Sequence, residues 1–342
     1  MAIIAENLGS GPQSALQVGG IMLPGRAFLA PMAGVTDAGM RRLAHRFGAS
    51  LSFTEMVAAD FFARGNYKAT LKAALAGAGL EAVQIAGCDP HLMAEAARLA
   101  EANGAALIDI NMGCPAKKVT GGFAGSHLMR DLDLAVAIIR ATVAAVRVPV
   151  SLKVRLGWDQ QRINAGELGR RAELEGIAML TVHGRTRCQF FSGGADWKAI
   201  GEVKEAVSLP VVANGDCRSL DDAVRMLKES EADAVMVGRA AIGQPWFVGE
   251  VAYRLSNGEA RGGIPLAERR DAAIEHFETL LELFGIQHGV RHARKHLSAY
   301  ARLVSREEAS PYRDSLVRLE CPRAIRTLLR QLFDQSLAME AA

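Results

Sequence analysis

The chain has 342 residues, of which 50% are hydrophobic and 23% charged, so it is long enough for one large domain and a small one and is not a disordered protein. Its formal net charge of +3 is too small to indicate nucleic-acid binding by itself. The five cysteines include no CxxC pair and fit neither a disulfide framework nor a zinc site, so we expect a reducing environment and no metal.

The first 20 residues contain the acidic Glu6 and no basic stretch ahead of an apolar one, so no export signal is predicted. No later apolar run approaches the roughly 20 residues that a membrane-spanning helix requires. We therefore expect a cytoplasmic protein without a membrane segment.

Short apolar runs alternate with longer amphipathic segments up to about residue 245, a pattern typical of βα units and a parallel sheet. The predicted strands are residues 27–30, 51–53, 82–86, 107–110, 150–154, 179–182, 210–213 and 234–237. The predicted helices between them are residues 37–46, 90–102, 131–146, 165–174, 196–207 and 220–229, several of which follow an Asp or Ser suited to cap a helix. Eight strands over this length favour an α/β fold of the (β/α)8 or TIM-barrel type over an open doubly wound sheet.

The alternation stops after about residue 245, and the rest of the chain has helical periodicity with almost no β-branched runs. We therefore predict a barrel domain over residues 1–245 and a small all-α helical domain over residues 246–342. Pro245 and the glycine-rich residues 262–265 mark the crossover. Pro311 and Pro322 are predicted to separate the later helices.

A polar or glycine-containing motif follows every predicted strand. The motifs are APMAG (30–34), TEM (54–56), QIAG (84–87), NMGCP (111–115), KVR (153–155), HGRT (183–186), NGD (214–216) and VGRAA (237–241). Because the C-terminal strand ends of a TIM barrel carry its active site, we expect these groups to converge on one mouth. Hydrogen-bonding groups gathered with glycine turns are what a cofactor site requires.

Taken in this order, the motifs resemble those of bacterial tRNA-dihydrouridine synthases, and more narrowly their B-type branch. The resemblance runs from Leu29 to Pro245 and, more loosely, through VRHARKHLSAY (290–300). It implies reduction of the C5=C6 bond of specific uridines in tRNA by reduced FMN, with NADPH, or else NADH, as the electron source. Flavin N5 would supply hydride to C6, and a protein acid would protonate C5.

Cys114 is the predicted catalytic proton donor. It lies in a loop where Pro115 stiffens the turn and Gly113 lets the backbone approach a ligand. An ordinary thiol, with a pKa of about 8.5, is largely protonated at neutral pH and can act as a general acid. The other cysteines are interpreted as structural.

The remaining motif residues are assigned to cofactor or substrate. Lys153 and Arg155 share one face of a strand whose alternate residues are apolar, and the resemblance places Lys153 near flavin N1 and O2. The loops after the seventh and eighth strands are where TIM barrels bind phosphate. The residues predicted to bind the cofactor are Pro31, Met32, Ala33, Gln84, Lys153, His183, Asn214, Gly215, Asp216, Gly238 and Arg239. Those predicted to bind the substrate are Asn111, Arg155, Arg291, Arg294 and Lys295.

Two of these assignments leave alternatives open, and the role of Glu55 is open as well. Asn111 could face either the flavin or the uracil, and so could His183. Glu55 could contact substrate or merely cap a helix.

The helical domain carries an excess of positive charge. Residues 291–330 contain ten Lys or Arg and four Asp or Glu. Arg291, Arg294, Lys295 and Arg302 have spacings that allow them to share one helix face, which suits contact with RNA phosphates. A solvated helix face is the alternative.

Two other function classes remain open. A flavin TIM-barrel reductase of a small pyrimidine-like molecule would need no basic helical domain, and a non-catalytic RNA-binding protein would need no Cys114.

The sequence has no Walker motif and no GxGxxG fingerprint, so no Rossmann domain for NADPH is predicted and NADPH would visit the flavin only transiently. We expect a monomer with tRNA as its partner.

Overall fold

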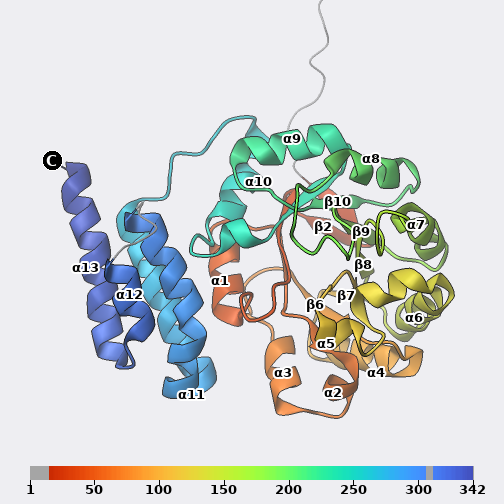
Figure 1. Cartoon of the computed structure of the whole chain (residues 1–342), viewed down its shortest axis with the longest axis horizontal. Coiled ribbons are helices and arrows are strands. Elements are labelled where there is room, and N and C mark those ends of the chain that lie inside the picture. The colour runs from red at the N-terminus through yellow and green to blue at the C-terminus, as the bar shows by residue number, and fades with distance from the viewer. Residues whose placement is uncertain (1–14, 306–310, 342) are drawn as a thin grey trace, which may run out of the picture.

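The computed structural model describes residues 15–305 and 311–341, with the barrel at one end of the molecule and the helices after residue 265 at the other (Figure 1). Residues 1–14, which make up most of the segment examined for an export signal, lie outside the described residues. Among the helices of the described ranges, none is long and apolar enough to cross a membrane.

In the described chain, eight parallel strands close into a ring, which confirms the predicted TIM barrel. Their order is β4, β3, β11, β10, β9, β8, β7, β6, and the pairing of β6 with β4 closes the barrel. The strands are β3 (Ala27–Leu29), β4 (Leu51–Phe53), β6 (Glu81–Ala86), β7 (Leu107–Met112), β8 (Val150–Arg155), β9 (Met179–His183), β10 (Val211–Asn214) and β11 (Ala234–Val237). All eight overlap the predicted runs. A short segment, β5 (Val57–Ala58), pairs with the far end of β6.

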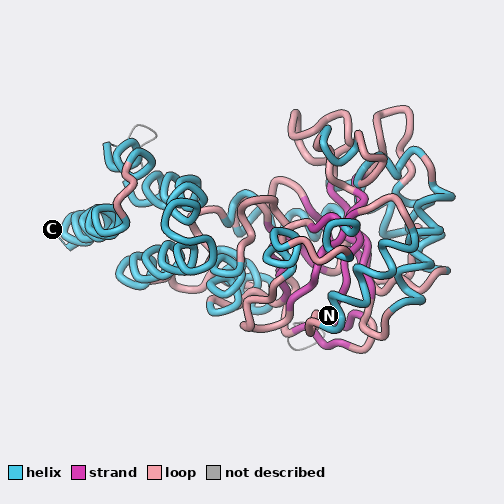
Figure 2. The backbone as a smooth tube through the Cα atoms, turned by 90° about the horizontal axis from the view of Figure 1, so that it is seen from below, coloured by secondary structure: helices cyan, strands magenta, loops and turns pink. Residues whose placement is uncertain are grey.

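Helices surround the strands, as the cyan and magenta segments of Figure 2 show. Those that match the predictions within a few residues are α1 (Ala38–Arg46), α4 (Pro90–Ala102), α6 (Leu132–Ala145), α7 (Ala165–Leu174), α8 (Trp197–Glu205) and α9 (Leu220–Ser230). Five of them begin after an Asp or Ser whose side chain accepts a backbone N–H of the first turn. The short segments α2 (Ala59–Ala63), α3 (Tyr67–Ala73), α5 (Lys117–Thr120), η1 (Gly125–Arg130) and η2 (Arg239–Ala241) were not predicted, because they are too short to show periodicity.

An unpredicted hairpin closes the barrel end opposite the mouth. Its strands are β1 (Leu16–Val18) and β2 (Ile21–Leu23). Val18 and Leu23 are buried in an apolar cluster with Phe28 and Leu107, which lie near the N-terminal ends of their strands. The site must therefore be reached from the other end.

Helix α10 (Phe247–Asn257) follows the predicted domain boundary at residue 245 but packs with the barrel. Phe247, Val248 and Val251 are buried in the same core cluster as the barrel strands and helices, and α10 contacts β3 and α9. A TIM barrel has a helix after every strand, and α10 fills that position after β11. We place the end of the barrel near residue 257.

The helical domain consists of α11 (Leu266–Ser305), α12 (Pro311–Arg318) and α13 (Pro322–Ala341), and the last two begin at the prolines that the sequence marked. Helix α11 is broken at Gly285, whose φ of 72° and ψ of 169° are not helical. Its two halves lie side by side, since the rings of His276 and His296 are 4.3 Å apart.

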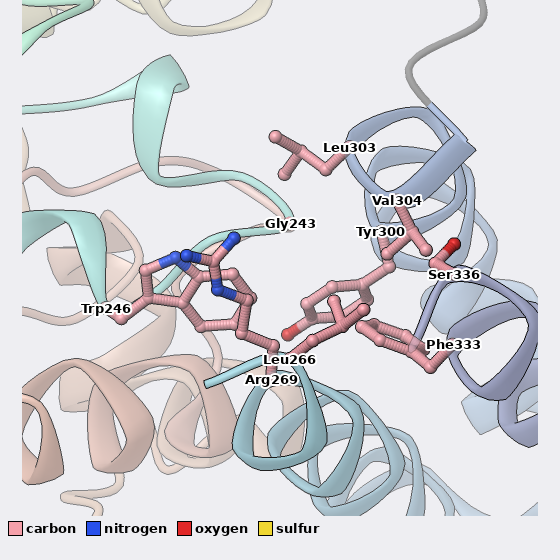
Figure 3. A pocket seen from close by; sticks show the side chains of 9 residues that line it. All are labelled: Gly243, Trp246, Leu266, Arg269, Tyr300, Leu303, Val304, Phe333 and Ser336. Atoms are coloured by element: carbon pink, nitrogen blue, oxygen red, sulfur yellow. The ribbon is translucent and has the colours of Figure 1, made fainter. Parts of the chain in front are cut away.

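The two domains share an apolar core at their junction. Leu43 and Phe47 of α1 belong to the same buried cluster as Phe277 and Phe333. A cavity of about 90 Å³ in this junction is lined by residues of both parts, among them Trp246 and Tyr300 (Figure 3). It is far smaller than the roughly 300–1,000 Å³ of typical ligand pockets, and none of the residues that line it belongs to a strand-end motif.

Candidate functional site

The predicted charged face of β8 lies inside the barrel. Leu152 and Val154 pack outward in the core between strands and helices, so Lys153 and Arg155 point to the interior. In the strand register Asn111 is opposite Lys153, and Arg155 is opposite His183. These predicted side chains are therefore neighbours at the mouth.

Lys153 is buried, and its Nζ donates a hydrogen bond to Asn214 Oδ1 over 2.9 Å. Burial lowers the pKa of Lys153, Arg155 lowers it further, and the carboxylate of Asp109 opposes both. A cation in this position would be stabilised by any additional negative charge that enters the mouth.

The loop that carries Cys114 is held on both sides of the thiol. The backbone N–H of Cys114 donates to Asn111 Oδ1 over 2.9 Å, and its carbonyl accepts from both the N–H and the hydroxyl of Ser126. Gly125 has a φ of +61°, and a Cβ there would lie 3.0 Å from the Cys114 carbonyl oxygen, so this close approach requires glycine. The side chain of Cys114 is half-buried and close enough to Lys153 for charges on the two to interact.

Arg155, predicted to bind the substrate, is nearly inaccessible to solvent. Its guanidinium donates to the backbone carbonyls of Gly113, Thr186 and Phe190. Burial lowers its pKa to about 10, and the neighbouring Arg185 contributes in the same direction. The contacts of Arg155 thus tie the Cys114 loop to the loop after β9.

His183 stands at the end of β9 among cations. Burial, followed by the charges of Lys153 and Arg155, holds the pKa of His183 well below its usual range. Its imidazole is therefore neutral at pH 7 and can both donate and accept a hydrogen bond. It does not add positive charge to the mouth.

The two loops predicted to bind phosphate meet around Asp216. Its carboxylate pairs with Arg185 over 2.5 Å, with Arg239 over 3.1 Å and with Arg218 over 3.3 Å. Arg185 is buried, whereas Arg218 and Arg239 are largely exposed. One carboxylate does not neutralise three guanidinium groups, so the loops keep a net positive charge. Arg218 was not predicted, although its position two residues after NGD was a signal.

Near these arginines, Gly238 has space beside its backbone, whereas Gly215 is buried in a crowded turn. Gly215 has a φ of +118°, and a Cβ there would approach the ring of His183 to 3.0 Å. A Cβ on Gly238 would meet only Ala30 and Met32, at 3.7 and 3.8 Å. The approachable backbone of Gly238 and the exposed guanidinium groups beside it form a suitable anion site.

The loop after β3, which includes Pro31, Met32 and Ala33, is held in place by hydrogen bonds to Thr36 and Glu55. Met32 N donates to Thr36 Oγ1 over 3.0 Å, and Gly34 N donates to Glu55 Oε2. Among the residues that the structure describes, Glu55 caps no helix; it accepts the Gly34 N–H and lies 3.7 Å from Lys72 Nζ, and so it holds this loop.

Helix α11 brings Lys295 to the same loop. Lys295 Nζ lies 3.5 Å from the position that a Cβ on Gly34 would occupy, and its side chain is half-buried. Burial lowers the pKa of Lys295, whereas Asp37 and Glu55 raise it. Arg291 and Arg302 are exposed, so Lys295 does not share their outward orientation.

Aromatic and arginine side chains that were not predicted form a rim on the loops around the mouth. The rim comprises Phe123, His127, Trp158, Arg187, Phe190 and Phe191. Phe123 and Phe191 are 61% and 53% exposed, and the Arg239 guanidinium lies 5.0 Å from the centre of the Phe191 ring. Phe123 and Phe190 both have positive φ angles, 59° and 50°, which are rare for bulky residues and occur at functional sites.

Asp37, His276 and His296 are grouped closely enough to hold a metal ion, with one ligand atom of each within 4.8 Å of the others. The sequence predicted no metal. His276 Nε2 lies 3.1 Å from Asp37 Oδ1, and its Nδ1 lies 3.1 Å from the hydroxyl of Tyr300. Each ring nitrogen of His276 therefore has a hydrogen-bond partner, Asp37 or Tyr300. These bonds join α1 to both halves of α11.

Comparison with known proteins gives consistent matches over nearly the whole chain. Residues 28–337 match the family model described as dihydrouridine synthase. The chain is 46% identical to tRNA-dihydrouridine synthase B of Xanthomonas axonopodis pv. citri, over 94% of this chain and 97% of that protein. It is 47% identical to a probable tRNA-dihydrouridine synthase of Rickettsia conorii, over 84% of this chain and 87% of the relative.

Solved structures support the fold alone. A variant of NCR from Zymomonas mobilis superposes with a TM-score of 0.52 at 17% identity, covering 75% of this chain and 94% of that one. Morphinone reductase in complex with tetrahydroNAD gives a TM-score of 0.50 at 15% identity, with 75% and 93% coverage.

Proposed function

Since the chain belongs to the dihydrouridine synthase family, we propose that it reduces the C5=C6 bond of specific uridines in tRNA to give 5,6-dihydrouridine. One observation carries the proposal: the half-buried thiol of Cys114, the buried Lys153 and a positively charged site suited to an anion all lie at the same mouth of the barrel. Reduction of a C=C bond next to a carbonyl needs a hydride source, a proton donor and a means of holding a negatively charged cofactor.

The residues around the mouth fit FMN. Gly238, Arg218 and Arg239 would hold its phosphate, because open backbone and unneutralised guanidinium groups meet there. The tight turn at Gly215 would set the position of the loop that carries Asp216 and Arg218. Lys153 would offer its positive charge to the pyrimidine edge of the flavin ring, and the backbone of residues 31–33 would pass along that ring. When bound, FMN supplies the hydride for uracil C6, after reduction by NADPH or NADH.

Cys114 completes the reaction from the protein side. Its S–H bond breaks, the proton goes to uracil C5, and the two former π electrons form the new C5–H bond. The resulting thiolate would lie near Lys153 and Arg155, whose charges stabilise it until it regains a proton from water. Gly113 and Ser126 hold the loop, so the thiol needs little reorganisation.

The uridine must leave its stack to reach this mouth, which costs a few kcal/mol. Exposed Phe123 and Phe191 offer stacking faces on the rim, and Arg291 and Arg294 of α11 offer positive charge for the backbone. Contacts of both kinds would offset the cost of extracting the base.

The test uses tRNA from a strain that lacks this gene, with mass spectrometry to count dihydrouridine. We expect the wild-type protein with FMN and NADPH to modify the tRNA but not free uridine. Cys114→Ala should slow modification by about 10²- to 10⁴-fold, the usual contribution of a general acid, while flavin content and NADPH oxidation remain. Cys188→Ala, which alters an exposed cysteine, is the control. Dihydrouridine formation at the wild-type rate by Cys114→Ala would overturn the assignment of the proton donor.

A further inference from the structure

A buried carboxylate that the proposed reaction does not use lies beneath the Cys114 loop. Asp109 is on the inner face of β7, fully buried, with Gln84 of β6 and Ser151 of β8 beside it in the strand register. Asp109 Oδ2 accepts from Gln84 Nε2 over 2.7 Å, and Oδ1 accepts from Ser151 Oγ over 2.5 Å.

Further hydrogen bonds lead from Gln84 through Asn111 to the Cys114 loop. Gln84 Oε1 accepts from Asn111 Nδ2 over 2.8 Å. Asn111 Oδ1 in turn accepts from the backbone N–H groups of Gly113, over 3.2 Å, and of Cys114, over 2.9 Å. Asp109, Gln84 and Asn111 form what we call the relay, and all three side chains are buried.

The relay has a direction, because each amide has one donating and one accepting end. An ionised carboxylate only accepts, so it turns the NH₂ group of Gln84 toward Asp109 and the carbonyl of Gln84 toward Asn111. That carbonyl then draws the NH₂ group of Asn111 and leaves its oxygen for the loop. If Asn111 were reversed, its NH₂ group would face two backbone N–H donors, and neither would have an acceptor.

We propose that Asp109 is a positioning residue, which orients Gln84 and Asn111 and thereby sets the place of Cys114 at the mouth. The inference rests on the proposed function, in which the Cys114 thiol delivers a proton. Asp109 itself touches neither the thiol nor the mouth; it acts through two amides whose order it determines.

The carboxylate of Asp109 is still mostly ionised at neutral pH, the form that can only accept hydrogen bonds. Burial raises the pKa of Asp109 to about 6, and hydrogen bonds from Gln84 and Ser151 together with the charge of Lys153 limit that rise. Ser151 lies on the other side of the carboxylate, and its hydroxyl can donate or accept, so it does not impose a direction on the relay.

The main experiment compares Asp109→Leu with Ser151→Ala in the purified, flavin-loaded protein. Ser151→Ala removes a hydrogen bond to the same carboxylate but leaves the relay intact, which makes it the matched control. Asp109→Leu should lower kcat for tRNA by about 10- to 100-fold with little change in KM, since a misplacement of about 1 Å can cost that much. Ser151→Ala should stay near the wild-type rate, and so should Asp109→Asn, whose carbonyl can still accept from Gln84.

A second readout follows the loop itself. The rate of Cys114 alkylation by iodoacetamide, measured by peptide mass spectrometry, should change in Asp109→Leu, while that of the exposed Cys188 in the same molecule stays constant. This readout needs no tRNA. If kcat and Cys114 alkylation both match those of Ser151→Ala, the relay has no positioning role, even where Cys114→Ala is inactive. If Cys114→Ala is active but alkylation changes in Asp109→Leu, the relay stands and the proton donor is another group.

Should Asp109→Leu fail to fold, an exchange of acid and amide replaces it. Gln84→Glu alone puts two carboxylates in contact and should slow modification increasingly as the pH rises, because one of them must hold a proton. Adding Asp109→Asn restores one carboxylate and one amide, with Asn111 still donating to residue 84, and should recover most of the Cys114 alkylation rate. No recovery in the double variant would overturn the proposal.

Discussion

Asp216 organises the arginines of the proposed phosphate site. It accepts from the N–H of Ala195 and pairs with Arg185, Arg218 and Arg239. These contacts hold the pKa of Asp216 below its ordinary value against the effect of burial, so the carboxylate stays ionised and keeps the guanidinium groups in place. The exposed guanidinium groups can turn toward an incoming phosphate without leaving the carboxylate unpaired, because Arg185 remains.

Gly215→Ala tests this site. The new Cβ would lie 2.8 Å from the Ala195 Cβ and 3.0 Å from the His183 ring, and φ is +118°, so the loop must shift. We expect FMN affinity, measured by quenching of flavin fluorescence, to fall by about 10-fold or more, the equivalent of roughly 1.4 kcal/mol. Gly194→Ala is the control, because nothing lies within 4 Å of its Cβ. Equal affinities for the two variants would argue against phosphate binding at this loop.

At the scale of elements, α1 and the two halves of α11 are joined by a charged group in an apolar setting. Asp37 caps α1 by accepting from Met40 N and also contacts His276. Burial raises the pKa of Asp37, but the two histidines prevail and hold it well below its ordinary value. Burial, followed by His276 and opposed by Asp37, lowers the pKa of His296 to about 4.

The junction should therefore weaken in acid. In the unfolded chain a histidine binds a proton below about pH 6.5, whereas folded His296 does so only near pH 4. Over that interval the unfolded state binds more protons, so the free energy of unfolding falls as the pH falls, by up to about 1.4 kcal/mol per pH unit from this group. Asp37 acts in the same direction at lower pH. Lys295 is the other charged neighbour of His296.

Urea unfolding between pH 7 and 4.5 checks this expectation. His296→Gln, which cannot titrate, should show a smaller loss of stability across the range than wild type. His91→Gln changes an exposed histidine of α4 and should follow the wild-type curve. If His296→Gln loses stability as steeply as wild type, the junction does not carry the acid sensitivity.

At the scale of the whole molecule, the helical domain meets the barrel beside its mouth. Lys295 reaches the β3 loop, and the exposed Arg291 lies one turn away on the same helix. An RNA that places a base in the mouth can therefore run across α11. The predicted basic surface is narrower than expected, since Lys295 is half-buried and Arg294 approaches Glu320 to 3.8 Å.

Replacement of Arg291 and Arg294 by alanine tests the RNA surface, with Lys295 left in place because it borders Glu55. We expect weaker tRNA binding, and the slope of log Kd against log salt should decrease by roughly 1.5, about 0.7–0.9 per lost phosphate contact. Flavin content should not change. Arg140→Ala with Arg171→Ala, on the outer wall of the barrel, provides an equal loss of charge. If both double variants have the same salt dependence, the effect is one of net charge and not of this surface.

Phe123→Leu and Phe191→Leu test the rim. Leucine keeps an apolar side chain but lacks a flat face, and stacking is worth about 1–3 kcal/mol per base, so tRNA affinity should fall by about 5-fold or more for each. NADPH oxidation in the absence of tRNA should be unaffected. Leu174→Ala removes an exposed apolar side chain on α7 and should bind tRNA normally. Wild-type affinity in both Phe variants would show that the rim does not stack on RNA.

Local patterns in the sequence determined the barrel and the ends of its strands. The alternation of polar and apolar residues put Lys153 on the face of β8 opposite its apolar residues, and capping residues such as Asp89 located helix starts. Both signals can be read from sequence because they depend only on neighbours along the chain. The motif order indicated the family that the comparisons show. Periodicity did not reveal the β1–β2 hairpin or the short α2 and α3, which span too few residues.

Tertiary structure alone decided the partners. Asp109 lies 25 residues after Gln84 and 42 residues before Ser151, and only closure of the barrel in one register brings the three together. The placement of Arg155 against three backbone carbonyls, of α10 on the barrel and of Lys295 toward the mouth likewise depends on how loops and helices pack. The spacing of residues along a helix or strand predicts which face a side chain occupies. Which residue it contacts on that face depends on how segments distant in sequence pack together.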